Sequence, residues 1–528
     1  MGRVYKHLPL LIVLMMGVFL ALLNQTLLNV AIPHLIQDFG VTASTAQWLL
    51  TGYMLVNGIL VPLTAYLVDR FGARQLFLAS MIFFTAGSLV CAMAPDFSVM
   101  LIGRLVQAVG AGILMPLVMV ITLYIFPPEV RGKGMGIFGL GMIFAPAIGP
   151  TLAGWIIENY DWRLLFYAMT PLGVIVIIVA FFLLKNSLQK ETKPEFDFRG
   201  AVTSSLGVGL LLYGLSEAGN REWSDPVIVA ALAVGVFFIG LFVVQQYRSR
   251  HPMLDFSVFR FDMFTLSNII NVIVTMAMFS GMFLLPIYLQ NLRGFTAFES
   301  GLLLLPGAII MGIMSPVSGT LFDKVGPRPL TTVGLLITAV TTYEFTHLTL
   351  ETSYGYILMI YMIRSFGMSL MMMPIMTAGL NQLPGELNSH GTAMSNTLKQ
   401  IAGSLGISIF TTIFSMRTQY HLGKLSEQAN LMDPAYSNHF YSYLDSFAQS
   451  LGLPKEQAQV MLTDALHGQA VRYASVMGIN DAFVWATVLA FVGFLLSLFM
   501  RDVRKDHMVS RPLARKQHRL DLIKGEIG

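Results

Sequence analysis

The sequence predicts an all-helical polytopic membrane protein, and three observations predict it: the composition, a series of long apolar segments and an internal repeat. Hydrophobic residues make up 55% of the 528 residues and charged residues only 12%, whereas soluble domains average about 25% charged residues. A water-soluble chain of this length could not cover its surface with so few polar groups. Most of the chain therefore faces lipid.

Fourteen segments are apolar over the about 20 residues that a helix needs to cross the hydrocarbon. The first is too long for the apolar core of a signal peptide, so we expect an uncleaved span. The expected spans are 9–33, 46–68, 75–94, 98–126, 134–157, 164–185, 200–217, 226–247, 263–291, 298–322, 329–349, 354–378, 395–417 and 476–500.

The distribution of Lys and Arg over the short loops predicts the topology. If both termini are cytoplasmic, thirteen of these residues lie in inside loops and three in outside loops. The loop 418–475 is then outside, and the basic tail 501–528 is cytoplasmic. That tail carries eight Lys/Arg against four Asp/Glu, which accounts for the net charge of +4. No basic patch remains elsewhere for nucleic acid.

The chain repeats itself at an offset of 254 residues. Residues 65–76, after the second expected span, and 319–330, after the tenth, share Leu, Asp, Gly, Arg and Leu, and Lys324 matches Arg70. Arg104 in the fourth span, which Gly110, Gly112 and Pro116 follow, has a counterpart in Arg364 of the twelfth span, which Gly367 and Pro374 follow. The repeat predicts a six-helix bundle (1–190), two inserted helices (191–255) and a second six-helix bundle (256–500). Parallel repeats of this kind favour a transporter, although duplicated bundles could also simply pack well.

The two repeated loops predict a conformational latch at the cytoplasmic ends of the helices. Gly72 allows a turn, and Asp69 can accept hydrogen bonds from the N-terminal end of a neighbouring helix. The alternative is that the charges only fix topology. The expected latch residues are Asp69, Arg70, Gly72, Arg74, Asp323, Lys324 and Arg328.

Arg104 and Arg364 fall inside expected spans. An intramembrane Arg is costly, so it faces a cavity or a partner; the alternative is that it snorkels to the interface. The fifth span is rich in Gly and contains Pro146 and Pro150, which favours a closely packed, bendable helix. Its G-x-G-x-x-G at 134–139 follows no strand, so a dinucleotide site is excluded.

Jointly, these motifs resemble the major facilitator superfamily. The loop Asp69-Arg70-x-Gly72-x-Arg74 is similar to its signature loop, with Ala65 in place of the usual first Gly, and the segment 104–112 is similar to its fourth-span Arg motif. Gly149, Pro150 and Gly154 resemble the antiporter motif, with Ala153 replacing one Gly. Residues 23–33 and 162–166 resemble the fourteen-span drug:proton antiporters of the EmrB/QacA type.

The resemblance implies a major facilitator fold of 6 + 2 + 6 helices in a bacterial cell membrane. It also implies proton-driven export of small amphipathic molecules by alternating access. The family often has Asp where Asn24 stands here, and Asn cannot carry a proton. The candidates for proton coupling are therefore Asp69, Arg104 and His34.

The candidate substrate cavity combines polar side chains that orient a ligand with Met and aromatic side chains that adapt to apolar ligands. The alternative for each apolar member is ordinary core or lipid-facing packing. The candidates are Asn24, Gln25, Asn29, Trp48, Tyr53, Arg104, Gln107, Asn268, Asn271, Phe279, Arg364 and Met371.

The loop 418–475 is the only long connection between spans. Pro454 divides it into two helix-like stretches, and Phe440, Tyr443, Leu444, Phe447 and Leu451 indicate an apolar face. It could lie on the membrane surface, cap the outer mouth, or dock a periplasmic adaptor or other accessory partner.

No phosphate-binding loop, metalloprotease motif or nucleophile elbow is present in the sequence. His residues and the single Cys91 are too scattered for a metal site, and no cofactor is expected. A secondary exporter of drugs is the first interpretation. An exporter of a specific metabolite, lipid or peptide and a polytopic membrane enzyme are the alternatives.

Overall fold

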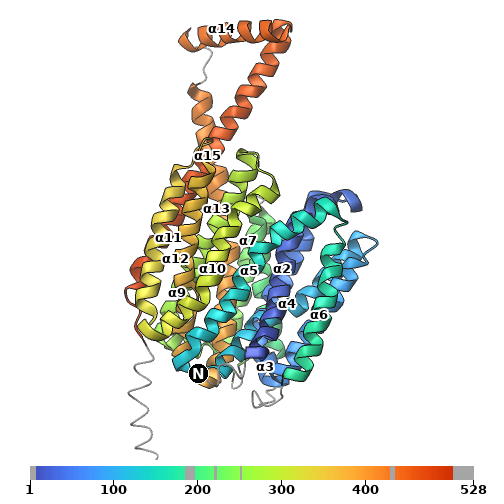
Figure 1. Ribbon diagram of the computed structural model, residues 1–528, viewed down its shortest axis with the longest axis vertical. Helices are drawn as coiled ribbons and strands as arrows, with labels where there is room; N and C mark the ends of the chain where they lie inside the picture. Colours follow the sequence, from blue (N-terminus) through green and yellow to red (C-terminus); the bar gives the residue numbers. More distant parts are fainter. Residues whose placement is uncertain (1–7, 185–196, 219–222, 250–251, 429–433, 503–528) are drawn as a thin grey trace, which may run out of the picture.

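The computed structural model describes residues 8–184, 197–218, 223–249, 252–428 and 434–502, and within these ranges the regular elements are all helical (Figure 1). The all-helical prediction is confirmed. The expectations for Arg3, Lys6 and most of the basic tail lie outside the described residues. The long helices are α2 (Leu8–Phe39), α3 (Ala43–Ala92), α4 (Phe97–Ile125), α5 (Arg131–Asn159), α6 (Leu164–Leu183), α7 (Phe198–Ala218), α8 (Pro226–Arg248), α9 (Asp262–Ile287), α10 (Ala297–Val325), α11 (Pro327–Glu344), α12 (Tyr354–Asn381), α13 (Asn388–Gln428), α14 (Pro434–Leu451) and α15 (Lys455–Ser497).

Every expected span overlaps one of these helices. Within the described ranges, ten helices are long and apolar enough to cross a membrane. The number of fourteen crossings stays a prediction, because helix length alone does not place a helix in the bilayer. Large apolar side chains such as Phe182, Val236 and Phe237 face outward from α6 and α8, as expected of a surface solvated by acyl chains.

Two glycines reproduce the sequence repeat in the backbone. The helix α3 breaks at Gly72, where φ is 74°, and so contains two expected spans. Gly326, 254 residues later, has φ 85° and joins α10 to α11. Only glycine adopts this conformation without strain. We call the end of the bundle that carries both turns the glycine-turn end.

Buried apolar side chains hold the helices together in clusters. One cluster draws mainly on α2 to α6. Two other clusters contain residues of the helices α9 through α13 and of α15. The helix α7 packs against α8, α3 and α13, and Trp223 Nε1, just before α8, donates to Thr412 Oγ1 of α13 at 2.6 Å.

Small residues bring α5 and α10 into close contact across the bundle. A Cβ added at Gly319 would collide with the carbonyl oxygen of Gly132 and lie 3.1 Å from the Cα of Gly136. Ser315 Oγ donates to the carbonyl oxygen of Gly136 at 2.9 Å. Such small residues allow helix backbones to approach closely in a membrane.

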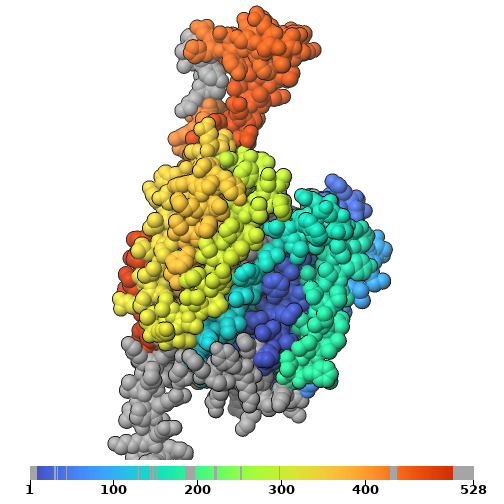
Figure 2. Space-filling view, viewed as in Figure 1, coloured from blue at the N-terminus to red at the C-terminus, as the bar shows by residue number. Residues whose placement is uncertain are grey.

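The region 418–475 is mostly helical. The helices α13 and α15 continue past the bundle, and α14 lies across their far ends at the top of Figures 1 and 2. Pro454 begins α15, so the expected division at this residue is confirmed. The apolar face is narrower than expected: Phe440, Leu444 and Phe447 pack in a cluster with Ala458 and Leu462. Tyr443 and Leu451 are instead exposed.

Candidate functional site

Arg104 lies fully buried in α4 and is held by neutral groups. Its Nη1 donates to Asn24 Oδ1 of α2 and to Gln107 Oε1, the latter at 2.5 Å. Its Nε donates to the carbonyl oxygen of Leu49 at 3.4 Å, and the guanidinium lies 4.2 Å from the ring centroid of Tyr53. Three of the expected cavity residues, Asn24, Gln107 and Tyr53, therefore meet around Arg104.

A further shell of hydrogen bonds fixes the partners of Arg104. Gln107 Nε2 donates to Ser88 Oγ at 2.7 Å, and Ser88 Oγ donates to the carbonyl oxygen of Phe84 at 2.8 Å. Tyr53 Oη donates to the carbonyl oxygen of Ala21 at 3.4 Å. Arg104 Nη2, however, has no hydrogen-bond partner among the described residues. The cluster thus holds an uncompensated charge with one unused donor group.

Arg364 occupies a similar environment in α12. Its Nη2 donates to the carbonyl oxygen of Ala277 in α9 at 3.0 Å, and its Nε donates to Thr342 Oγ1 of α11 at 3.3 Å. A Cβ added at Gly281 would collide with its guanidinium. Both buried arginines therefore bind neutral oxygen atoms inside the bundle.

The other expected cavity residues are dispersed. Asn268 donates to the carbonyl oxygen of Phe264 in its own helix at 2.8 Å. Asn271 is buried in α9, and Gln25 in α2 is partly buried. Met371 belongs to an apolar cluster with Leu330 and Leu335. Trp48 is 44% exposed and stacks on Tyr213 of α7 at 6.1 Å. The side chain of Asn29 lies outside the described residues.

Asp69 contacts the first turn of α13 at the glycine-turn end. Ser389 Oγ donates to its Oδ1 at 3.3 Å, and His390 Nε2 lies 3.8 Å from its Oδ2. Arg70 points its guanidinium toward the rings of Tyr66 and Phe71. Arg74 Nη2 donates to the carbonyl oxygen of Phe181 in α6 at 2.9 Å.

Asp323 makes the corresponding contact with the start of α5. Its two carboxylate oxygens accept from the backbone N–H groups of Gly132 and Lys133, each at 3.0 Å. A carboxylate at a helix N-terminus satisfies free donors and interacts favourably with the helix dipole. Lys324 and Arg328 are exposed nearby. The predicted contact between an aspartate and a neighbouring helix start is thus present, most clearly at Asp323.

The antiporter-like segment packs against α2. A Cβ added at Gly149 would collide with Thr26 Oγ1, whereas Gly154 has open space beside it. The side chain of Pro150 lies outside the described residues. His34 is exposed near the end of α2, away from the Arg104 cluster.

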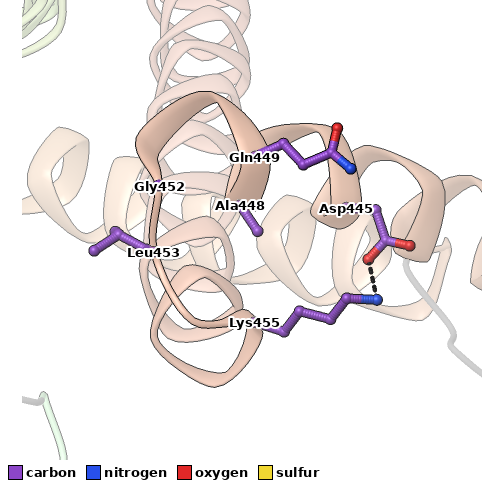
Figure 3. Close-up of a pocket in the computed structure, with 6 residues that line it drawn as sticks. All are labelled: Asp445, Ala448, Gln449, Gly452, Leu453 and Lys455. Carbon is purple, nitrogen blue, oxygen red and sulfur yellow. Dashed lines mark ion pairs between the residues drawn. The ribbon is translucent and has the colours of Figure 1, made fainter.

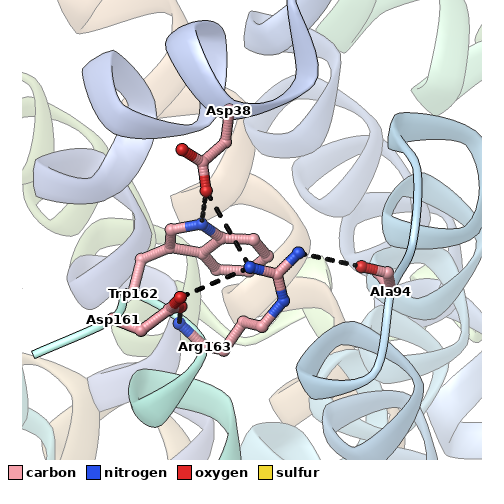
Figure 4. A network of polar contacts seen from close by, with 5 residues as sticks. All are labelled: Asp38, Ala94, Asp161, Trp162 and Arg163. Atoms are coloured by element: carbon pink, nitrogen blue, oxygen red, sulfur yellow. Dashed lines mark hydrogen bonds and ion pairs between the residues drawn. The ribbon is translucent and has the colours of Figure 1, made fainter.

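At the end of the bundle opposite the glycine turns, a polar network ties α2 to the start of α6 (Figure 4). Trp162 Nε1 donates to Asp38 Oδ2 at 2.6 Å, and Arg163 lies 3.8 Å from the same oxygen. Arg163 also donates to the carbonyl oxygen of Ala94 at 3.3 Å. Trp162 and Arg163, which belong to the segment 162–166 that resembles drug:proton antiporters, therefore join three chain segments.

Two charged groups inside α13 and α15 were not among the sequence candidates. Asp481 accepts from Arg417 at 2.5 Å and lies 2.8 Å from His421. Lys399 lies within α13 and makes no hydrogen bond or ion pair to the described residues. A lysine at the fifth position of the expected span 395–417 was the available signal.

The described surface hollows lie on α14 and α15. One is lined by Asp445, Ala448, Gln449, Gly452, Leu453 and Lys455 (Figure 3). Lys455 Nζ and Asp445 Oδ1 form an ion pair of 2.7 Å across it. Among the described residues, no group of His, Cys, Asp or Glu could hold a metal ion.

Comparison with known proteins places this architecture among transporters. The family model described as Major Facilitator Superfamily matches residues 14–407. The chain is 58% identical to the MFS-type transporter YhcA of Bacillus subtilis over 94% of each chain. It is 37% identical to the lincomycin resistance protein LmrB of the same organism, covering 95% of this chain and 98% of that protein. Identity to the multidrug export protein EmrB of Escherichia coli is 30%, over 92% and 93% of the two chains.

Solved structures share the fold at low sequence identity. The crystal structure of the human organic anion transporter MFSD10 aligns with a TM-score of 0.62 and 14% identity, covering 93% of this chain and 99% of that one. The proton:xylose symporter XylE aligns with a TM-score of 0.57 and 12% identity, covering 94% and 96%. At these identities the likeness shows the fold alone.

Proposed function

Because the chain belongs to the major facilitator superfamily, we propose that this multi-pass membrane protein is a secondary transporter that exports drugs or other amphipathic small molecules by alternating access. The names of its relatives LmrB and EmrB support drug export as the activity. No phosphate-binding loop is present in the sequence, so the proton gradient supplies the energy. Export of a specific metabolite, lipid or peptide is the alternative that keeps the same mechanism.

The observation that carries the proposal is the duplicated contact at the glycine-turn end. Asp69 meets the start of α13, and Asp323 meets the start of α5. Each contact joins one repeat to the other, so the two together hold the bundles closed at this end. Breaking both opens the central region to this side, which is what alternating access needs.

We assign the chain two six-helix bundles, 1–190 and 256–500, with α7 and α8 as the insert 191–255. In this arrangement α3 supplies two crossings and the total is fourteen. The glycine-turn end and both termini are cytoplasmic, α14 is outside, and the membrane is the bacterial plasma membrane. An adaptor that docks on the region 418–475 would meet it outside the cell.

The proton pathway runs through groups other than Asn24. Asp69 is the candidate with a carboxylate at a contact that must break, and Arg104 is the charge that responds to a titrating neighbour. His34 is a weaker candidate because it is exposed and remote from Arg104. Proton uptake by Asp69 weakens its contact with Ser389 and His390.

Proteoliposomes that contain the purified full-length protein, with its cytoplasmic side facing outward, test this function. An imposed inside-acid gradient is expected to drive uptake of labelled lincomycin or an amphipathic dye, and a protonophore is expected to abolish it. Uptake that survives complete collapse of the proton gradient contradicts the energy source. Chemical conversion of the probe without movement favours the membrane enzyme.

A further inference from the structure

The charged side chains buried in the described part of the protein are all basic. Arg104, Arg131 and Arg364 are buried, and no Asp or Glu is buried among the residues whose side chains the structure describes. The carboxylates of Glu299 and Glu344 sit in the first turn of α10 and at the last residue of α11. The fully buried charges are therefore positive, whereas Asp69, Asp323 and Asp481 are partly buried and are held in the polar contacts described above.

Lys399 adds a fourth cation in the first third of α13. It lies deep in the protein and has no hydrogen bond or ion pair to the described residues. Its side chain is partly exposed and not fully enclosed. An unpaired ammonium in such a place is costly, and intramembrane charges of this kind mark binding sites or pathways.

Neighbouring residues on α13 show which way Lys399 points. Residues 396, 399 and 403 lie on one face of the helix, because they are three and four positions apart. Asn396 Nδ2 contacts Met119 Sδ of α4 at 3.7 Å, and a Cβ at Gly403 would lie 2.9 Å from the ring of Phe279 in α9. Lys399 therefore points toward the region between α4 and α9.

Two close contacts between α13 and α9 show which residues of α9 lie at the same height as Lys399. A Cβ built at Gly391 would lie 3.3 Å from the ring of Phe264, and a Cβ built at Gly406 would lie 2.9 Å from the Cα of Met276. Lys399, midway between these glycines, is thus level with Asn271. The amide of Asn271 thus lies at the level of Lys399 along α9, and the ring of Phe279 lies about one helical turn further on, beside Gly403.

We propose that the cargo is an amphipathic anion and that Lys399 binds its carboxylate, sulfonate or phosphate group. This inference rests on the proposed export function and names the charge of its substrates. An anion is attracted by the unpaired Lys399 and by the summed charge of Arg104 and Arg364, whereas a cation meets no buried carboxylate in the described interior. Phe279 and its apolar neighbours on α9 contact the apolar body of the cargo.

Two pyrene probes with opposite charge test the inference by equilibrium dialysis against the purified full-length protein in detergent. They are 4-(1-pyrenyl)butanoate and 4-(1-pyrenyl)butyltrimethylammonium, which share the aromatic body. We expect the parent protein to bind the anion at least about tenfold more tightly, the effect of one hydrogen bond to a charged group. Equal binding, or tighter binding of the cation, overturns the proposal without any variant.

Substitutions of Lys399 then test whether its ammonium group binds the anionic probe. Lys399→Met keeps a long unbranched side chain and is expected to weaken anion binding about tenfold while leaving cation binding within twofold. Lys399→Arg is expected to restore anion binding, which a purely structural effect of Met would not require. The matched control is Lys424→Met, on the exposed part of the same helix. Anion binding that is unchanged in Lys399→Met overturns the assignment.

Vesicle uptake of the same probes separates this inference from the proposed function. If the anion binds selectively but a pH gradient moves neither probe, export fails and the charge inference stands. If the gradient moves the cation and not the anion, export stands and the charge inference fails. Gradient-driven uptake of the anion that is lost in Lys399→Met supports both.

Discussion

Arg104 is stabilised by a polarised environment and not by a counter-ion. Asn24, Gln107 and the carbonyl oxygen of Leu49 accept its hydrogen bonds, and the face of Tyr53 adds a cation–π contact. Neutral acceptors offset part of the desolvation cost and leave the positive field in place. A carboxylate at the same position would neutralise that field.

Asn24→Asp is therefore expected to change both the pH profile and the charge preference of export. The new carboxylate lies on Arg104, titrates with it, and favours cationic over anionic substrates. Initial uptake rates in vesicles between pH 5.5 and 8.5, with the two pyrene probes, measure the change. Asn159→Asp at the exposed end of α5 is the control. A variant indistinguishable from the parent in both respects would contradict this role of Asn24.

His390 is held in its neutral form at the glycine-turn end. Its Nδ1 accepts from the backbone N–H of Asp255 at 3.3 Å, which protonation of that nitrogen would prevent. Burial lowers the pKa of His390, although Asp69, Asp255 and the Met253 backbone oppose the shift. The folded protein therefore binds this proton less readily than the unfolded chain does.

The sign of the pH dependence follows from this depressed pKa. Below the unfolded pKa of about 6.5, the unfolded chain takes up the proton first, so stability falls with pH until the folded pKa is passed. Each unit of depression costs about 1.4 kcal/mol. We expect Tm in detergent to fall more between pH 8 and pH 5 for the parent than for His390→Gln. The exposed His467→Gln should follow the parent, and identical slopes for the parent and His390→Gln would contradict the role of burial.

At the scale of elements, α5 and α10 form the closest contact between the two repeats. Gly132 and Gly319 meet backbone to backbone, and Asp323 caps the start of α5 directly beside them. A packing contact and a polar cap thus act on the same helix end. We therefore expect the packing contact and the polar cap to be released together when this end of the bundle opens.

Gly319→Val is expected to force α5 and α10 apart and to expose their interface from the glycine-turn side. Ser315, buried in that interface, is changed to Cys in a Cys91→Ala background to report the opening. A membrane-impermeant maleimide is expected to label Ser315→Cys at least about fivefold faster when Gly319→Val is present. Gly240→Val, where a Cβ has open space, is the control. Unchanged labelling would show that the contact does not close this end.

At the scale of the whole molecule, the orientation in the membrane is the first property to establish. The excess of Lys and Arg predicts that both termini are cytoplasmic and that α14 is outside. A fluorescent protein fused to the C-terminus is expected to fluoresce, and alkaline phosphatase inserted after Gly452 is expected to be active. Alkaline phosphatase fused to the C-terminus is expected to be inactive, and a fluorescent protein inserted after Gly452 is expected not to fluoresce. A C-terminal phosphatase that is active outside the cell would reverse the topology.

The sequence predicted much of the architecture because the bilayer imposes strong rules on it. Span length, loop charge and the repeated Asp-x-x-Gly loop are local signals, and they led to α2 to α13 and to the turns at Gly72 and Gly326. The partners of Arg104 on α2 and α3 could be named but not paired, because pairing depends on how helices cross. The helical form of 418–475 was only partly visible, because its helices bury a short apolar face on one another.

The uninterrupted helix α13 has a mechanical consequence. Its 41 residues span about 60 Å at 1.5 Å per residue, from Ser389 beside Asp69 to the support of α14. If α13 tilts as a rigid helix by about 10° around one end, its other end moves by about 10 Å, given the rise per residue. A distance probe on α14 would therefore report the state of the Asp69 contact at the opposite end of α13.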